Sequence, residues 1–161
     1  MREHEFKALV VDDDPIARRL VGVALGDEGF ECAYAADGDD ALDQIAAKQF
    51  DLVVTDLCMP HKHGHALAVE LLARGNGPVI VVYTAVDDPR MTKDLITRGV
   101  DDIIYKPTNY PAFAAKTRAL VQRRMRAKAQ PVTAPALSFQ TQDDAATETA
   151  VLPDTQCVFG D

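Results

Sequence analysis

The sequence predicts an α/β fold in which five parallel strands form a doubly wound sheet with helices on both faces. Short apolar, β-branched runs alternate with segments of helical periodicity through roughly the first 127 residues. The runs at 6–11 and 79–85 are almost wholly apolar, as is typical of strands covered on both sides. At 161 residues and 47% apolar content, the chain can build one core of ordinary size.

The first unit pairs a strand at 6–11 with the helix that follows it. Asp14 offers an N-cap and Pro15 suits the first turn, while Gly29 closes the segment. The apolar spacing predicts that one stripe of this helix faces the sheet, formed by Ile16, Leu20, Val23 and Ala24.

The second and third units follow the same plan. A weaker strand at 32–36 precedes a helix at 39–49, and a clear strand at 52–55 precedes a helix at 65–75. The side chains expected to face inward from the helix at 39–49 are Ala41, Leu42 and Ile45.

The last two strands are expected at 79–85 and 103–105. Asp88 and Pro89 begin the helix between them, and Gly99 ends it. An amphipathic helix at 111–128 completes the domain, with a basic end that suits the helix dipole and an inward face formed by Phe113, Leu120 and Val121.

The domain is therefore expected to span residues 1–128, with a flexible acidic linker or tail at 129–161. That tail is rich in Ala, Thr and Gln, and it has no Lys or Arg and no sustained period. Its acidic residues give it a formal charge of −5, and they are Asp143, Asp144, Glu148, Asp154 and Asp161.

Composition limits the setting and the partners. A formal net charge of −8, from 25 acidic and 17 basic residues, argues against nucleic-acid binding by bulk electrostatics. Three widely spaced cysteines, Cys32, Cys58 and Cys157, suggest neither a disulfide framework nor a zinc site. No signal peptide or membrane-length apolar run is visible, so a cytoplasmic location is expected.

Polar side chains stand where the predicted strands end. Asp12 and Asp13 follow the first strand, Asp56 the third, Thr84 the fourth and Lys106 the fifth. Ligands of an open parallel sheet bind outside the carboxyl ends of its strands, where the strand order reverses. With the order 2-1-3-4-5, the first and third strands are neighbours and their carboxylates converge.

Converging carboxylates repel one another and lose hydration, so a positive charge is needed among them. Mg²⁺ is the favoured ion because it binds through a few carboxylates and keeps its waters. With Lys106 arriving from the far side, the pocket suits a phosphoryl group attached to one carboxylate.

Simpler explanations exist for each residue taken alone. A single Asp at a strand end is usually a cap or a turn former, as we expect for Asp14. The three histidines of the 61–65 stretch, HKHGH, invite a metal interpretation, but without acidic or Cys partners at ligand spacing a polar loop is favoured. The coincidence of the whole set at successive strand ends is what favours a site.

Residues 5–126 resemble the receiver domain of two-component response regulators, a flavodoxin-like family that includes chemotaxis regulators. The resemblance lies in VVDDDP at 10–15, DLVVTDLCMPHKHG at 51–64, VIVVYTA at 79–85 and DDIIYKP at 101–107. It implies a phosphoacceptor signalling domain rather than an enzyme, with at most self-phosphorylation and slow autodephosphorylation.

The resemblance also implies a role for each site residue. Asp56 would accept a phosphoryl group from a sensor histidine kinase or a histidine phosphotransfer protein. Asp12, Asp13 and Asp56 would hold Mg²⁺ together with the main-chain carbonyl of Cys58. Thr84 and Lys106 would contact the phosphoryl group, and the Lys106–Pro107 bond would be cis.

Two positions depart from the family pattern. The aromatic residue usual three positions before the lysine is Ile103 here, and Tyr105 directly precedes Lys106 instead. Thr108 stands where Phe is common. We still expect phosphorylation to reorder the 84–90 loop, with any change at Ile103 occurring by aliphatic repacking.

Other classes of function remain open at this point. An Asp-nucleophile phosphohydrolase uses similar groups, although this chain lacks room for a substrate cap, and its first strand lacks the DxD-then-Thr arrangement of such enzymes. A receiver fold serving only as an interaction module is the third class. The output domain or target is not written in the sequence, and a phosphorylation-dependent homodimer through the last helix is an expectation by analogy.

Overall fold

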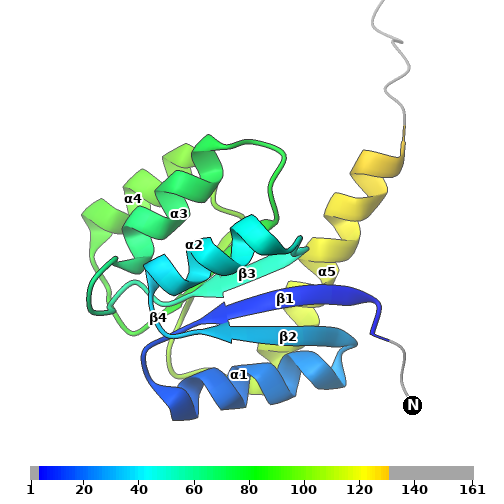
Figure 1. The fold of residues 1–161 in the computed structure, drawn as a ribbon, viewed down its shortest axis with the longest axis horizontal. Helices are drawn as coiled ribbons and strands as arrows, with labels where there is room; N and C mark the ends of the chain where they lie inside the picture. Colours follow the sequence, from blue (N-terminus) through cyan, green and yellow to red (C-terminus); the bar gives the residue numbers. More distant parts are fainter. Residues whose placement is uncertain (1–3, 131–161) are drawn as a thin grey trace, which may run out of the picture. The chain divides into compact units, whose positions relative to one another are not determined.

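Five parallel strands, hydrogen-bonded in the order β2-β1-β3-β4-β5, form the sheet of the computed structural model (Figure 1). The structure describes residues 4–130. Strands and helices alternate along the chain as β1 (Phe6–Val11), α1 (Pro15–Asp27), β2 (Phe30–Ala35), α2 (Gly38–Ala47), β3 (Leu52–Thr55), α3 (Gly64–Ala73), β4 (Val79–Thr84), α4 (Pro89–Arg98), β5 (Asp102–Tyr105) and α5 (Tyr110–Ala129). The predicted doubly wound topology is confirmed.

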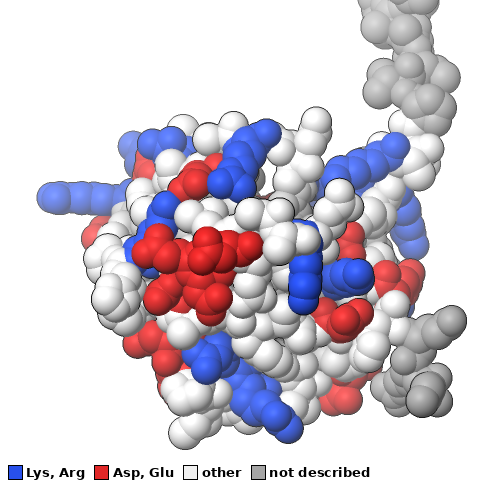
Figure 2. All heavy atoms as spheres, in the orientation of Figure 1, with Lys and Arg blue, Asp and Glu red and all other residues white. Residues whose placement is uncertain are grey.

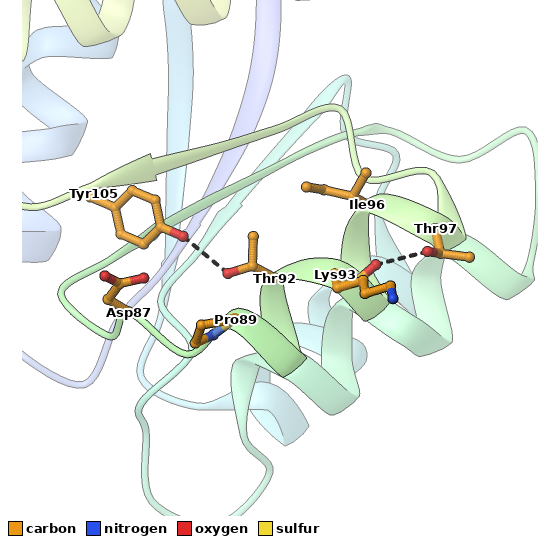
Figure 3. A pocket seen from close by; sticks show the side chains of 7 residues that line it. All are labelled: Asp87, Pro89, Thr92, Lys93, Ile96, Thr97 and Tyr105. Carbon is orange, nitrogen blue, oxygen red and sulfur yellow. Dashed lines mark hydrogen bonds between the residues drawn. The ribbon is translucent and has the colours of Figure 1, made fainter.

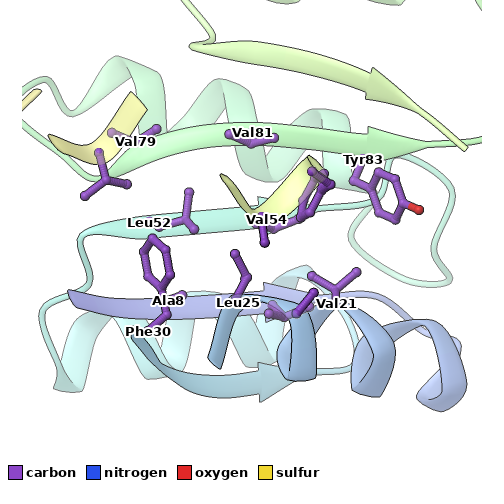
Figure 4. Close-up of a cluster of buried hydrophobic side chains, with 14 of the residues drawn as sticks. Ala8, Val21, Leu25, Phe30, Leu52, Val54, Val79, Val81 and Tyr83 are labelled. Atoms are coloured by element: carbon purple, nitrogen blue, oxygen red, sulfur yellow. The ribbon is translucent and has the colours of Figure 1, made fainter. Parts of the chain in front are cut away.

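Helices cover both faces of the sheet, and each face has its own buried core. On one face α1 and α5 pack on the strands, and the large buried side chains there include Leu25 and Phe30 (Figure 4). Phe113 of α5 belongs to the same core. On the other face α2, α3 and α4 contribute Ala41, Leu67 and Leu95. Because successive strand residues point to opposite faces, almost every residue of β1, β3 and β4 is buried.

The helix ends match the capping residues expected from the sequence. Asp14 caps α1 through a 2.9 Å bond from the Ile16 N–H, with Pro15 in the first turn. Asp88 caps α4 in the same way, and Gly99 ends that helix in the left-handed region at φ 97°.

The predicted inward stripe of α1 is wrong at three of its four positions. Ile16, Leu20 and Val23 are 69%, 44% and 51% exposed, and of the four only Ala24 is buried. The helix instead turns Val21 and Leu25 toward the sheet. Apolar residues fill two overlapping faces of this helix, so periodicity alone could not choose between them.

The contact between α1 and β2 accounts for which face of α1 points toward the sheet. A Cβ built on Gly22 would lie 2.1 Å from the Tyr34 hydroxyl, so a larger residue here would require the Tyr34 side chain to move. Facing Gly22 toward β2 brings Val21 and Leu25 over the sheet and leaves the surface formed by Ile16, Leu20 and Val23 uncovered within the described residues 4–130.

The remaining differences are at boundaries. β2 begins at Phe30, two residues before the predicted start, and Phe30 is 1% exposed. The inward faces predicted for α2 and α5 are confirmed, with Leu42, Ile45 and Leu120 partly buried. Residues 131–161, which hold most of the predicted tail, lie outside the described residues. No helix between residues 4 and 130 is long and apolar enough to cross a membrane.

Candidate functional site

The site lies at the carboxyl ends of β1 and β3, which are neighbours in the sheet. Val11 pairs with Thr55, so Asp12 and Asp56 follow directly after residues held side by side. The Asp56 N–H donates to the Val11 carbonyl at 3.0 Å, which extends the ladder to the phosphoacceptor candidate. The switch in strand order therefore brings the two carboxylates together, as expected for this class of sheet.

Lys106 reaches this point from the end of β5. Its main-chain N–H donates to the Thr84 carbonyl at 2.8 Å, and the Lys106–Pro107 peptide bond is cis, as predicted. The Lys106 ammonium donates to Oδ2 of Asp12 at 2.9 Å and to Oδ2 of Asp56 at 3.1 Å. One cation thus pairs with two carboxylates that lie 94 and 50 residues away along the chain.

Charge and burial compete at these groups. Asp12 is 4% exposed and Asp56 is 9% exposed. Burial raises the pKa of Asp12 and outweighs its hydrogen bonds from Lys106 and the Asp14 N–H. Burial acts to lower the pKa of Lys106, but the bonds to the two carboxylates prevail and raise it. The ammonium is therefore held in its charged form.

Main-chain donors and a second cation fix the carboxylates and their loop. Asp12 Oδ1 accepts from the Asp14 N–H at 2.9 Å, and Asp56 Oδ1 accepts from the Cys58 N–H at 3.2 Å. The Arg18 guanidinium donates to the Asp12 carbonyl at 2.8 Å. The side chain of Cys58 is exposed. Each carboxylate thus has one oxygen engaged by backbone and the other by Lys106.

Gly64 is part of the site for a steric reason. A Cβ at this position would lie 1.6 Å from the Asp56 carbonyl oxygen, a distance no side chain can occupy. The Gly64 N–H also donates to the Leu57 carbonyl at 3.3 Å. The first residue of α3 therefore packs directly on the main chain of Asp56, which accounts for the spacing between Asp56 and Gly64 in the sequence motif.

Thr84 stands at the end of β4, fully buried. Its hydroxyl accepts from the Val86 N–H at 3.1 Å, which ties it to the loop that leads into α4. Lys106 bonds to Asp12 and Asp56, and no hydrogen bond within residues 4–130 joins Thr84 to that set through its side chain. The structure therefore places Thr84 beside the site, with its hydroxyl engaged in the 84–90 loop.

The position of the usual aromatic residue is filled by a half-buried aliphatic side chain. Ile103 packs against the core on the α3 and α4 side. Tyr105, two residues on, lines a hollow of about 360 Å³ beside α4 (Figure 3). Its hydroxyl lies 3.0 Å from the Thr92 hydroxyl of α4. Tyr105 thus connects β5 to α4 one position before Lys106.

The histidine-rich stretch makes polar contacts with α3 and α4. His65 Nε2 lies 2.8 Å from Asp94 of α4, and Lys62 pairs with Glu70. Within residues 4–130 the single group of carboxylate, His or Cys ligand atoms with metal spacing is Asp12, Asp13 and Asp56. The expectation of a polar loop at 61–65 agrees with these contacts.

The acidic group fits the predicted ion. Carboxylate oxygens of Asp12, Asp13 and Asp56 lie within 4.8 Å of one another, and Asp13 is exposed. Hard oxygen donors with one open, solvated side are what Mg²⁺ prefers. Figure 2 shows further Asp and Glu side chains gathered over the start of α2, whose first turn carries Asp39 and Asp40. Acidic side chains on this face therefore extend beyond Asp12, Asp13 and Asp56.

A switch-point carboxylate pair with a lysine between them, on this fold, is the arrangement that the resemblance to receiver domains implied. Residues 8–118 match the response regulator receiver domain family, and the chain belongs to it.

Among curated relatives, response regulator MprA of Mycolicibacterium vanbaalenii is 35% identical over 117 residues, 73% of this chain and 51% of its own. Sensor histidine kinase RcsC of Salmonella typhi is 34% identical over 122 residues, 76% of this chain and 13% of its own. The chain therefore spans about half the length of MprA.

A solved structure agrees with the same assignment. The chemotaxis response regulator CheY4 of Vibrio cholerae is 29% identical, with a TM-score of 0.63 over 72% of this chain and 98% of that one. The receiver domain is a signal-receiving phosphoacceptor domain in two-component systems, which confirms the class expected from the sequence.

Proposed function

We propose that Asp56 accepts a phosphoryl group from a phosphohistidine of a sensor kinase or a phosphotransfer protein. A carboxylate oxygen of Asp56 attacks phosphorus, the P–N bond breaks, and the imidazole nitrogen leaves with the electron pair. The observation that carries the proposal is the contact of Lys106 with both Asp12 and Asp56 at the switch point. Asp12 and Asp13 have no proposed covalent role.

The neighbouring groups manage the charge that such a transfer brings. Asp12, Asp13, Asp56 and the carbonyl of Cys58 would hold Mg²⁺, whose charge would offset the phosphoryl oxygens. The Lys106 ammonium would exchange its bond with Asp56 for one with the phosphoryl group. The Cys58 N–H keeps the second oxygen of Asp56 oriented.

The site also suggests how phosphorylation is transmitted. Thr84 would turn its hydroxyl from the Val86 N–H toward the phosphoryl group, which frees the 84–90 loop to reorder. NMR chemical shifts at Thr84 to Arg90 are expected to change on activation. Their constancy would contradict this part of the proposal. Signal would then pass to an output domain or target protein, with slow autodephosphorylation resetting the domain.

A protein donor is supported by the apolar face of α1, which nothing within residues 4–130 covers. Ile16 follows Asp13 by three residues, so a protein donor that reaches Asp56 would come close to this end of the face formed with Leu20 and Val23. Burial of such side chains is the main favourable term in association.

We further propose a cytoplasmic setting and the division into a receiver at 1–128 and a tail at 129–161.

Intact mass after incubation with acetyl phosphate tests the proposal. A gain of one phosphoryl group, about 80 Da, is expected with Mg²⁺ and not without it. The Asp56→Asn variant is the control and is expected to show no gain. If the wild-type protein gained nothing under any condition, the phosphoacceptor proposal would fail, and the receiver fold would act as an interaction module.

A further inference from the structure

Lys106 has a third neighbour besides its two carboxylates. Its ammonium lies 5.1 Å from the centroid of the Tyr83 ring. This is within the range at which a cation is attracted to the face of an aromatic ring. The side chain of Lys106 is 22% exposed, so this attraction is only partly screened by water.

Tyr83 is held rigidly by its surroundings. It is the residue before Thr84 on β4, it is 3% exposed, and it lies at the carboxyl end of that strand (Figure 4). Its ring lies 4.8 Å from Phe113 and 6.3 Å from Tyr110, centroid to centroid, both on α5. Burial, and then hydrogen bonding to Tyr110, raise the pKa of Tyr83 to about 12, so the ring stays neutral.

The contact gives Lys106 an anchor that does not change during the proposed reaction. Its bond to Asp56 depends on the charge of that carboxylate, which phosphorylation alters. The ring of Tyr83 belongs to the core between the sheet and α5 and carries no such dependence. A long, flexible side chain is thereby kept at the switch point while its partners change.

We propose that Tyr83 is a positioning residue, whose ring face holds the Lys106 ammonium where it meets the phosphoryl group on Asp56. The inference rests on the proposed function for its effect on phosphorylation. The position of Lys106 over the ring is a property of the unmodified protein and can be tested independently.

Three variants separate positioning from simple packing. Tyr83→Phe keeps the ring and removes the hydroxyl, while Tyr83→Leu removes the ring. Phe30→Leu is the matched control, because Phe30 is equally buried in the same core but contacts Phe6 rather than Lys106. Circular dichroism and urea unfolding establish the folded fraction of each variant.

The first readout is the NMR shift of the Lys106 side-chain methylene protons, identified by their loss in Lys106→Arg. Protons above a ring face are shifted upfield, so we expect an upfield shift in wild type, Tyr83→Phe and Phe30→Leu, and its loss in Tyr83→Leu. An unchanged Lys106 shift in Tyr83→Leu would overturn the proposal whether or not the protein is phosphorylated.

The second readout is the initial rate of phosphorylation by acetyl phosphate with saturating Mg²⁺, normalised to folded protein. Tyr83→Leu is expected to be slower than wild type by about three- to thirtyfold, the range of a partly desolvated cation–π contact. Tyr83→Phe and Phe30→Leu should stay within about twofold. Equal rates for Tyr83→Leu and Phe30→Leu would reduce Tyr83 to a packing residue. A wild-type protein that takes no phosphoryl group would instead defeat the proposed function and leave the NMR comparison to decide the positioning role.

Discussion

Lys106 Nζ lies 2.9 Å from Asp12 Oδ2, and this ion pair joins the end of the edge strand β5 to the end of the inner strand β1. Asp12 is buried there, and its pKa is raised although a cation is in contact with it. The charged form of the Asp12 carboxylate is thus unfavourable in the folded protein, and a further positive charge nearby would stabilise it.

Removing the charge of Asp12 should therefore stabilise the fold. Because the folded pKa of Asp12 lies above its ordinary 3.8, its contribution to stability is present below that pH and is lost as pH rises through the folded pKa. We expect Asp12→Asn to raise the free energy of unfolding at pH 7 by on the order of 1 kcal/mol without Mg²⁺. Urea titrations at pH 7 and pH 4 check this, and the difference from wild type should shrink at the lower pH. An Asn variant less stable than wild type at pH 7 would contradict the prediction.

Mg²⁺ should stabilise the folded protein through the same group of carboxylates. At a hundred times its dissociation constant, a ligand that binds only the native state adds about 2.7 kcal/mol. We expect the thermal midpoint of wild type to rise with Mg²⁺ and that of Asp13→Asn to rise much less, since Asp13 is the exposed member of the group. Differential scanning calorimetry measures both midpoints. Equal Mg²⁺-induced shifts in the two proteins would mean that the ion binds elsewhere.

Gly64 should not tolerate even a methyl group. The Cβ of Gly64→Ala would meet the Asp56 carbonyl oxygen at 1.6 Å, so we expect a loss of about 3 kcal/mol or more in the free energy of unfolding. Gly26→Ala is the control, because nothing lies within 4 Å of its Cβ and it sits inside α1. That change should stabilise by about 0.5–1 kcal/mol. Urea unfolding of both variants checks the contrast, and similar effects would refute it.

The orientation of α1 can be checked with two leucines five residues apart. Leu25 is fully buried and Leu20 is 44% exposed. Leu25→Ala is expected to cost about 2–5 kcal/mol of unfolding free energy, and Leu20→Ala less than about 1 kcal/mol. Chemical denaturation of the pair measures both. A larger loss at Leu20 would restore the inward stripe expected from the sequence.

Much of the fold and of the site could be predicted from the sequence, because strands, helix caps and strand-end side chains are recognised from short stretches of consecutive residues. The carboxylates of Asp12 and Asp56 could be placed together once strand order was expected from the alternating units. The orientation of α1 could not be predicted from the sequence, since it depends on how closely Gly22 approaches Tyr34 of β2.

Contacts made by side chains distant in the sequence were also beyond sequence reasoning. His65 meets Asp94 across 29 residues, and the Tyr83 ring meets Lys106 across a strand pairing. Tyr83 carried no signal of its own, because an aromatic residue in a buried strand is ordinarily a core residue. Tyr83 differs from an ordinary core aromatic residue only because its ring faces the Lys106 ammonium.

Asp56, and neither Asp12 nor Asp13, is the residue that we expect to take the phosphoryl group. The most direct measurement is borohydride reduction of the phosphorylated protein followed by peptide sequencing by mass spectrometry, since an acyl phosphate is reduced to an alcohol. We expect homoserine at position 56 and unmodified aspartate at positions 12 and 13. Homoserine at either of those positions, with position 56 unchanged, would contradict it.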